Sequence, residues 1–223
     1  MAARKELILP GMPIDKKGLK PGSNVYVEGD KIYSPLIGLL DIKNNVVNVI
    51  PLKGTYIPRV GDRVVGIITG YSLYSWSVDI RSPYEAILMA AAAFKKPLSK
   101  PTVSLSKFLD IGDVIVAKVK SFDLLSNPTL SINEKGYGKV EKGTLVEITP
   151  VKVPRLIGKR GSLINLIKKK LNVDMIIGQN GRIIVVGKDR EAELRAAQII
   201  HKVEREAHVP GLTDRISKML EEW

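Results

Sequence analysis

Four short segments of the chain repeat one local design, in which a glycine precedes a run of β-branched residues. They are residues 22–27, 61–65, 112–116 and 143–146. Glycine and the small polar residues that usually follow it favour a turn, whereas valine and isoleucine suit a pleated strand. Successive glycines are 39, 51 and 31 residues apart, so this is not a fixed-period repeat array. The design predicts several small β modules in succession, each beginning with the same turn chemistry.

The charge of the chain points to the kind of partner it meets. The 223 residues include 35 Lys and Arg against 23 Asp and Glu, a formal net charge of +12. The excess is spread as +3 over residues 1–58, +4 over 59–140 and +5 over 141–223, rather than gathered in a tail. Basic residues on folded surfaces predict a polyanionic partner, or a basic patch on a larger assembly.

Several classes of function are disfavoured by composition. Cysteine is absent, and the two histidines, His201 and His208, are too few for a histidine-built metal site. The longest apolar run, residues 86–94, has nine residues, whereas a membrane-spanning helix needs about 20. Residues 1–6 lack the long hydrophobic core of a signal peptide. We therefore expect a soluble cytoplasmic protein without a metal or cofactor.

The first module, residues 1–58, contains short strand candidates and no catalytic constellation. Strands are predicted at 24–28, 31–33 and 46–51, separated by turns at Gly29-Asp30 and Asn44-Asn45. A small all-β module that docks on another protein is the economical interpretation.

The second module, residues 59–140, is expected to be a β barrel interrupted by one helix. Strands are predicted at 63–69, 74–80, 114–120 and 129–133, and alternation in the second places Tyr74, Trp76, Val78 and Ile80 on one face. The capping-box pattern of residues 82–85 predicts a helix over 86–94, ended by residues 95–97. This helix is interpreted as packing on its own barrel, with a subunit contact as the alternative.

In the third module, residues 141–223, the spacing of apolar residues changes and helices are predicted as well as strands. The predicted order is β-α-α-β-β-α, with strands at 144–149, 173–177 and 182–186. A short helix near Pro154, a helix at 162–171 and a long helix capped by Asp189 complete it. Asn180-Gly181 is a strong hairpin signal. In the tail 212–223, Leu212, Ile216 and Leu220 form an amphipathic stripe that is expected to cover a neighbour.

The sharpest local feature is the loop Gly158-Lys159-Arg160-Gly161 between the first two helices of this module. Because glycine has no Cβ, a nucleic-acid backbone can approach the loop closely. The N-terminus of the following helix is expected to offer free N–H groups to phosphate. Residues 148–173 contain seven Lys or Arg and no Asp or Glu. Ile157, Ile164 and Ile167 are expected to line a groove beside the loop. The alternative is a tight helix–helix turn with incidental charge.

These motifs resemble two families of RNA-binding domain. Residues 143–207 resemble the KH domain, whose Gly-x-x-Gly loop clamps single-stranded nucleic acid. The resemblance implies a type I KH domain in which Ile157, Gly158, Lys159, Arg160, Gly161 and Ile164 contact RNA. Residues 61–68, 77–80, 112–119 and 130–132 resemble the S1 domain, a five-stranded OB barrel.

The S1 resemblance implies roles for individual residues of this chain. S1 domains often present two aromatic residues, a His, an Asp and an Arg to RNA. Tyr74 matches the first aromatic residue and Asp123 the Asp. Ser77, Leu88 and Asn127 occupy or adjoin the other positions, with Trp76 beside Ser77. Tyr74 and Trp76 are candidates for base stacking, with barrel core or rim as the alternative. Backbone electrostatics are expected from four basic residues, namely Arg63, Arg81, Lys118 and Lys120.

The order of a β module, an S1 domain and a KH domain, with the segments 29–38 and 92–97, resembles the RNA-binding cap subunits of the archaeal RNA exosome. The resemblance implies a trimeric cap on a hexameric ring of RNase PH-like subunits. The cap gathers single-stranded RNA, with a preference for A-rich tails, and the ring degrades it 3′ to 5′. The first module would dock on the ring, S1 would face the pore and KH would lie toward the periphery.

Two other functions are consistent with the residues. Polynucleotide phosphorylases also pair KH with S1, but there KH precedes S1, and no catalytic module fits in 58 residues here. A free-standing RNA chaperone or translational regulator would carry the same two domains. We expect a non-catalytic exosome subunit.

Overall fold

The structure, a computed structural model, describes residues 6–15, 18–93, 105–207, 209 and 211–221. The chain divides into two compact units, Met1–Gly54 and Thr55–Trp223, and each is described by itself.

The described residues of the first unit form seven short strands in two sheets. They are β1 (Leu7–Ile8), β2 (Ile14–Asp15), β3 (Lys20–Pro21), β4 (Tyr26–Glu28), β5 (Lys31–Tyr33), β6 (Gly38–Lys43) and β7 (Val46–Pro51). One sheet has the order β1-β6-β7-β3 and the other β2-β5-β4. The three predicted strands are confirmed as β4, β5 and β7. The sequence pattern missed the six-residue strand β6 and the two-residue strands, and the latter carry too few residues to show a period.

The turn between β6 and β7 has the backbone that its residues favour. Asn44 and Asn45 adopt φ of 50° and 59°, a left-handed conformation that asparagine tolerates better than most residues. The core beneath is small, with Ile8, Ile14, Ile32 and Val47 buried.

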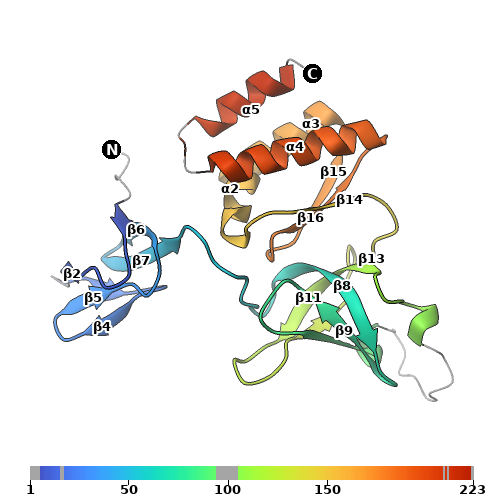
Figure 1. Cartoon of the computed structure of the whole chain (residues 1–223), viewed down its shortest axis with the longest axis horizontal. Coiled ribbons are helices and arrows are strands. Elements are labelled where there is room, and N and C mark those ends of the chain that lie inside the picture. The colour runs from blue at the N-terminus through green and yellow to red at the C-terminus, as the bar shows by residue number, and fades with distance from the viewer. Residues whose placement is uncertain (1–5, 16–17, 94–104, 208, 210, 222–223) are drawn as a thin grey trace. The chain divides into compact units, whose positions relative to one another are not determined.

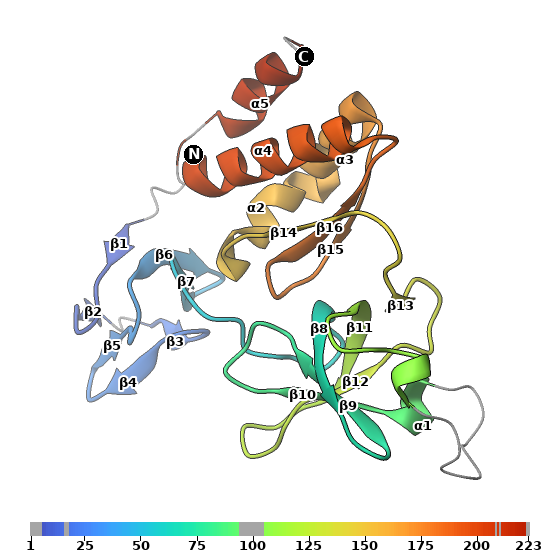
Figure 2. The ribbon, with the colours of Figure 1, turned by 45° about the vertical axis from the view of Figure 1, so that its right-hand side comes forward.

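Five strands of the second unit form a closed barrel. They are β8 (Arg63–Tyr71), β9 (Ser75–Asp79), β10 (Ala86–Met89), β11 (Val114–Ser121) and β12 (Thr129–Ser131). The sheet order is β12-β10-β9-β8-β11, and pairing of β11 with β12 closes it. A short strand, β13 (Gly138–Lys139), adds to β11. Figure 2 shows these strands curving around a common interior.

The prediction of a helix over residues 86–94 is wrong for the first half of that segment. Ala86–Met89 is strand β10, which pairs antiparallel with β9 and parallel with β12. The helix α1 spans only Ala90–Ala93, and Phe94 with residues 95–97 lies outside the described residues. Barrel closure needs a strand between β9 and β12, and this requirement overrides the helix propensity of the run. The described part packs on its own barrel, because Ala90 is buried and Ala92 and Ala93 contact the core.

Trp76 is fully buried in the barrel core. The alternation predicted for β9 is confirmed for Trp76 and Val78, both 0% exposed. The Trp76 indole Nε1–H donates a hydrogen bond to the Leu109 carbonyl at 3.0 Å. A 3-10 helix, Leu105–Lys107, precedes that contact.

The rest of the second unit has the predicted order β-α-α-β-β-α. Its elements are β14 (Thr144–Glu147), α2 (Val153–Ile157), α3 (Ser162–Leu171), β15 (Asp174–Ile177), β16 (Arg182–Val186) and α4 (Arg190–Glu206). The sheet order is β14-β16-β15, and α3 and α4 cover one face (Figure 1). The Asp189 carboxylate accepts a hydrogen bond from the Ala192 N–H at 2.8 Å, as expected of an N-cap.

The amphipathic tail forms α5 (Leu212–Glu221) and covers its own module. Leu212, Ile216 and Leu220 are at most 6% exposed and share one core with α3 and α4. Figures 1 and 2 both place α5 on the helical side, away from the sheet. The neighbour that the stripe was expected to cover is therefore this module.

The turn between β15 and β16 joins this module to the barrel. Asn180 is 0% exposed, and its amide donates to the carbonyls of Val65 and Ile80 at 2.7 and 2.9 Å. Its Oδ1 accepts from the Val65 N–H at 3.2 Å. A Cβ on Gly178 would stand 2.9 Å from the Val65 nitrogen, so the close approach requires glycine there. The predicted hairpin turn thus also holds two domains together.

An ion network completes the junction. Arg182 is 5% exposed and donates to the Asp79 carboxylate at 2.6 Å and to Glu147 at 2.7 Å. Arg81 donates to the Ile148 carbonyl at 2.7 Å and lies 3.6 Å from Glu147. The buried guanidinium of Arg182 is thus paired with two carboxylates, which are 43% and 41% exposed.

The junction is expected to weaken in acid. Burial would raise the pKa of the Asp79 carboxyl, but hydrogen bonds from Arg182 and from the Arg81 N–H outweigh it and hold that pKa below its usual 3.8. A depressed folded-state pKa contributes stability above the unfolded pKa, and this is lost as pH falls through the folded value. Asp79→Asn should therefore show a smaller drop in unfolding free energy below about pH 4. The difference should be at most about 1 kcal/mol, because the side chain is 43% exposed.

Urea unfolding of the whole chain between neutral pH and pH 3 measures this effect, and Glu141→Gln is the control at an exposed carboxylate. Equal acid dependence in Asp79→Asn and the unsubstituted chain would contradict the assignment.

Candidate nucleic-acid interface

The loop between α2 and α3 has a backbone that its glycines make possible. Gly158 adopts φ 75° and ψ 177°, and a Cβ there would stand 2.9 Å from the Leu163 nitrogen. Gly161 is left-handed, with φ 80°. Arg160 is also left-handed, at φ 54°, which is uncommon for a residue of its size. Backbone held in this region clusters at ligand-binding sites.

The loop presents basic side chains at the N-terminus of α3. Lys159 and Arg160 are exposed, and the 3-10 turn Lys159–Gly161 leads directly into α3. Gly161, the N-cap of α3, provides no side-chain hydrogen bond to the first turn. The Ser162 N–H, the first of the ten-residue helix α3, donates to the Lys159 carbonyl, and the helix dipole favours an anion at this end.

Apolar side chains flank the loop on both helices. Leu156, Leu163 and Ile167 are buried and fix α2 and α3 on the core, so the expectation that Ile167 lines the groove is wrong. Ile157 and Ile164 are half-buried and pack against the same core, which leaves part of each at the surface. The predicted residues Ile157, Gly158, Lys159, Arg160, Gly161 and Ile164 thus lie together.

The predicted barrel residues do not all lie on an accessible surface. Tyr74 is 59% exposed at the tip of the β8–β9 hairpin. Trp76 has no accessible ring face, because it fills the barrel core, so the expectation that it stacks on RNA is wrong. Strand alternation alone could have assigned it to the core, because Val78 and Ile80 share its face.

The four predicted basic residues of the barrel have different surroundings. Arg63 lies 5.0 Å from the centroid of the Tyr137 ring, a cation–π contact, and Lys118 pairs with Glu134 at 2.8 Å. Arg81 belongs to the junction with the third module, so it is a structural residue here. Lys120 is exposed on β11 and has no ion pair with any residue that the structure describes.

The remaining S1 positions also differ from the family pattern. Asp123 is exposed and caps its own loop, where its carboxylate accepts from the Leu125 N–H at 2.9 Å, and hydrogen bonds within the loop lower its pKa. Leu88 is buried, and Asn127 is exposed. The usual set of stacking and polar groups is therefore not assembled on this barrel.

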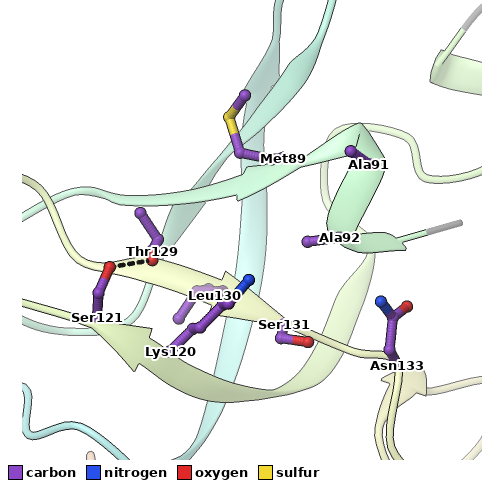
Figure 3. A pocket seen from close by; sticks show the side chains of 9 residues that line it. All are labelled: Met89, Ala91, Ala92, Lys120, Ser121, Thr129, Leu130, Ser131 and Asn133. Carbon is purple, nitrogen blue, oxygen red and sulfur yellow. Dashed lines mark hydrogen bonds between the residues drawn. The ribbon is translucent and has the colours of Figure 1, made fainter. Parts of the chain in front are cut away.

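The sequence pattern missed an open groove of about 520 Å³ on the barrel exterior. It lies between β10 with α1 on one side and β11 with β12 on the other (Figure 3). Its lining residues are Met89, Ala91, Ala92, Lys120, Ser121, Thr129, Leu130, Ser131 and Asn133. No sequence signal joins them, because the groove exists only once residues 86–89 form a strand.

The residues that the structure describes lack two further kinds of feature. Within them, no cluster of three or more His, Cys, Asp or Glu is placed to bind a metal ion. Within the same residues, no helix combines the length and apolar character needed to cross a membrane.

Three family models match successive parts of the chain. Residues 5–53 match the N-terminal domain of the exosome RNA-binding protein RRP4, residues 55–121 the RRP4 S1 domain, and residues 143–191 a KH domain. The fold and these matches define a protein with an N-terminal β domain, an S1-type OB barrel and a KH domain.

Relatives of known name match over almost the whole chain. The exosome complex component Rrp4 of Thermofilum pendens is 45% identical over 98% of this chain and 93% of its own. That of Thermococcus kodakarensis is 45% identical over 97% and 85%. A crystal structure described as an exosome complex RNA-binding protein superposes with a TM-score of 0.72, at 36% identity, over 76% of this chain and 97% of that one. The chain belongs to the Rrp4 family of exosome components.

Proposed function

We propose that this chain is the non-catalytic RNA-binding cap subunit of an RNA exosome. It binds single-stranded RNA, with A-rich tails preferred, and delivers it to a ring that degrades it 3′ to 5′. The observation that carries this proposal is the exposed Lys159-Arg160 pair on the Gly-x-x-Gly loop, at the N-terminus of α3. The relatives are named exosome complex component Rrp4, and this name supports the proposal that the chain is part of an exosome.

The RNA contacts divide between the two domains of the second unit. Gly158 and Gly161 let the phosphate backbone approach, Lys159 and Arg160 neutralise it, and Ile157 and Ile164 line the groove for bases. On the barrel, Tyr74 stacks on a base, and Arg63, Lys118 and Lys120 contribute charge. Arg81 supports this surface only through the junction.

The assembly has three chains of this kind on a hexameric ring of RNase PH-like subunits in the cytoplasm. Residues 1–58 dock on the ring, residues 59–140 form the S1 domain near the pore, and residues 141–223 form the KH domain toward the periphery. Catalysis belongs to the ring.

The native mass of the assembly tests this proposal. The chain should be co-expressed with RNase PH-like ring subunits and purified through a tag on the ring. We expect one species with the mass of six ring subunits and three copies of this chain. A chain that never co-purifies with the ring but binds RNA alone would instead support a free-standing RNA chaperone.

A further inference from the structure

The barrel groove has two walls of different chemistry. One wall is apolar, formed by Met89 at the end of β10 and by Ala91 and Ala92 of α1. The opposite wall carries the polar side chains of Lys120, Thr129, Ser131 and Asn133. Figure 3 shows Met89, Ala91 and Ala92 on one side of the hollow and Lys120, Thr129 and Ser131 on the other.

The polar wall retains unused hydrogen-bonding capacity. Ser121 and Thr129 satisfy each other through their hydroxyl groups, as the dashed line in Figure 3 marks. In contrast, Lys120 Nζ, Ser131 Oγ and the Asn133 amide have no hydrogen-bond partner within the described parts of the chain. A cation, a hydroxyl and an amide therefore face one hollow without protein partners.

The shape and size suit one nucleotide. A volume of about 520 Å³ falls within the range of small-molecule sites. An ammonium group suits phosphate, hydroxyl and amide groups suit a sugar hydroxyl, and an apolar wall suits the face of a base. Tyr74 is adjacent, because its carbonyl accepts a hydrogen bond from the Ala90 N–H at 2.8 Å. A strand leaving the groove could thus stack its next base on Tyr74.

We propose that this groove binds one ribonucleotide of the RNA strand and makes the barrel selective for RNA over DNA. The phosphate lies against Lys120, the 2′-hydroxyl against Ser131 and Asn133, and the base against Met89, Ala91 and Ala92. Only RNA carries the 2′-hydroxyl, so loss of the Ser131 and Asn133 groups costs RNA affinity and leaves DNA affinity unchanged. This inference rests on the proposed function, because it specifies how the same barrel holds its RNA.

The test compares ribose and deoxyribose strands of equal sequence. Fluorescence anisotropy of the full chain with A-rich oligonucleotides of about 12 residues gives Kd for RNA and for DNA. In Ser131→Val/Asn133→Leu, we expect RNA affinity to fall about 5- to 50-fold, from the loss of two hydrogen bonds. DNA affinity should stay within about twofold, so the RNA-to-DNA ratio falls. Repeating both titrations with Lys159→Asp/Arg160→Asp removes the KH contribution.

A second variant tests the phosphate contact. Lys120→Gln should make the salt dependence of RNA binding shallower by about 0.7 in log–log slope. Lys135→Gln, an exposed lysine that does not line the groove, is the control and should leave the slope unchanged. Urea unfolding midpoints confirm that each variant is folded.

Several results would overturn the inference. Equal losses for RNA and DNA in Ser131→Val/Asn133→Leu, or no loss for either, would mean that the groove reads no ribose. A change in the native mass of the protein without a change in RNA affinity would assign the groove to contact with a second protein chain. If the unsubstituted chain binds no RNA, the proposed function fails as well. If it binds RNA and the groove variants give one of the results above, only this inference fails.

Discussion

Replacement of Lys159 and Arg160 by aspartate is expected to weaken binding of single-stranded RNA roughly 100-fold, because two charge-assisted phosphate contacts are lost. The salt dependence of binding should also become shallower by about 1.4 in log–log slope, the value for two phosphates of a single strand. Aspartate is among the residues that tolerate the left-handed backbone of Arg160, so the loop should keep its fold. Titration of the full chain with an A-rich RNA at several salt concentrations measures both effects.

A matched control separates a local effect from a change in total charge. Lys188→Asp/Arg190→Asp alters the charge of the same domain by the same amount at the N-terminus of α4, where acidic residues are favourable. That end of α4 lies beside the end of α3 remote from the loop, since Lys170, Leu171 and Asp189 line one hollow. Equal losses in the two variants would mean that the loop is only a turn and that the charge acts in bulk.

The second large effect is expected at the junction of the S1 and KH domains. Asn180→Ala should lower the free energy of unfolding by about 2–4 kcal/mol, measured by urea unfolding at neutral pH. The substitution removes three buried hydrogen bonds and leaves the Val65 N–H and the carbonyls of Val65 and Ile80 without their partner. Unpaired buried polar groups are more costly than the average hydrogen bond is stabilising.

The neighbouring residue provides the control for this prediction. Gln179 is exposed, and the contact it makes across the junction is from its backbone N–H to the Arg63 carbonyl at 2.8 Å. Gln179→Ala retains that hydrogen bond, so its unfolding free energy should change by less than about 0.5 kcal/mol. If the two variants unfold alike, Asn180 does not hold the domains together.

Local patterns predicted the KH domain well because its elements are defined by short-range signals. The helix expected at 162–171 and the strand at 182–186 have those bounds in the structure, and Asp189 caps α4 as expected. Each of these rests on periodicity or capping within a few residues.

The failures share a long-range cause. Residues 86–89 form a strand only because β9 and β12 need a partner between them, and β12 lies 40 residues further along the chain. Asn180 could be predicted as a turn residue but not as a junction residue, because its partners Val65 and Ile80 lie more than 90 residues upstream. The groove on the barrel depends on the same closure, so no local pattern indicates it.

The division of labour proposed for this chain is tested most directly by phosphate-dependent release of nucleoside diphosphates from an A-tailed RNA. We expect the purified chain alone, with Mg²⁺ and phosphate, to release none. Added to RNase PH-like ring subunits, it should increase the rate at low RNA concentration, and Lys159→Asp/Arg160→Asp should lose most of that increase. Release of nucleoside diphosphates by the chain alone, or a ring rate that the chain leaves unchanged, would contradict a non-catalytic RNA-binding cap.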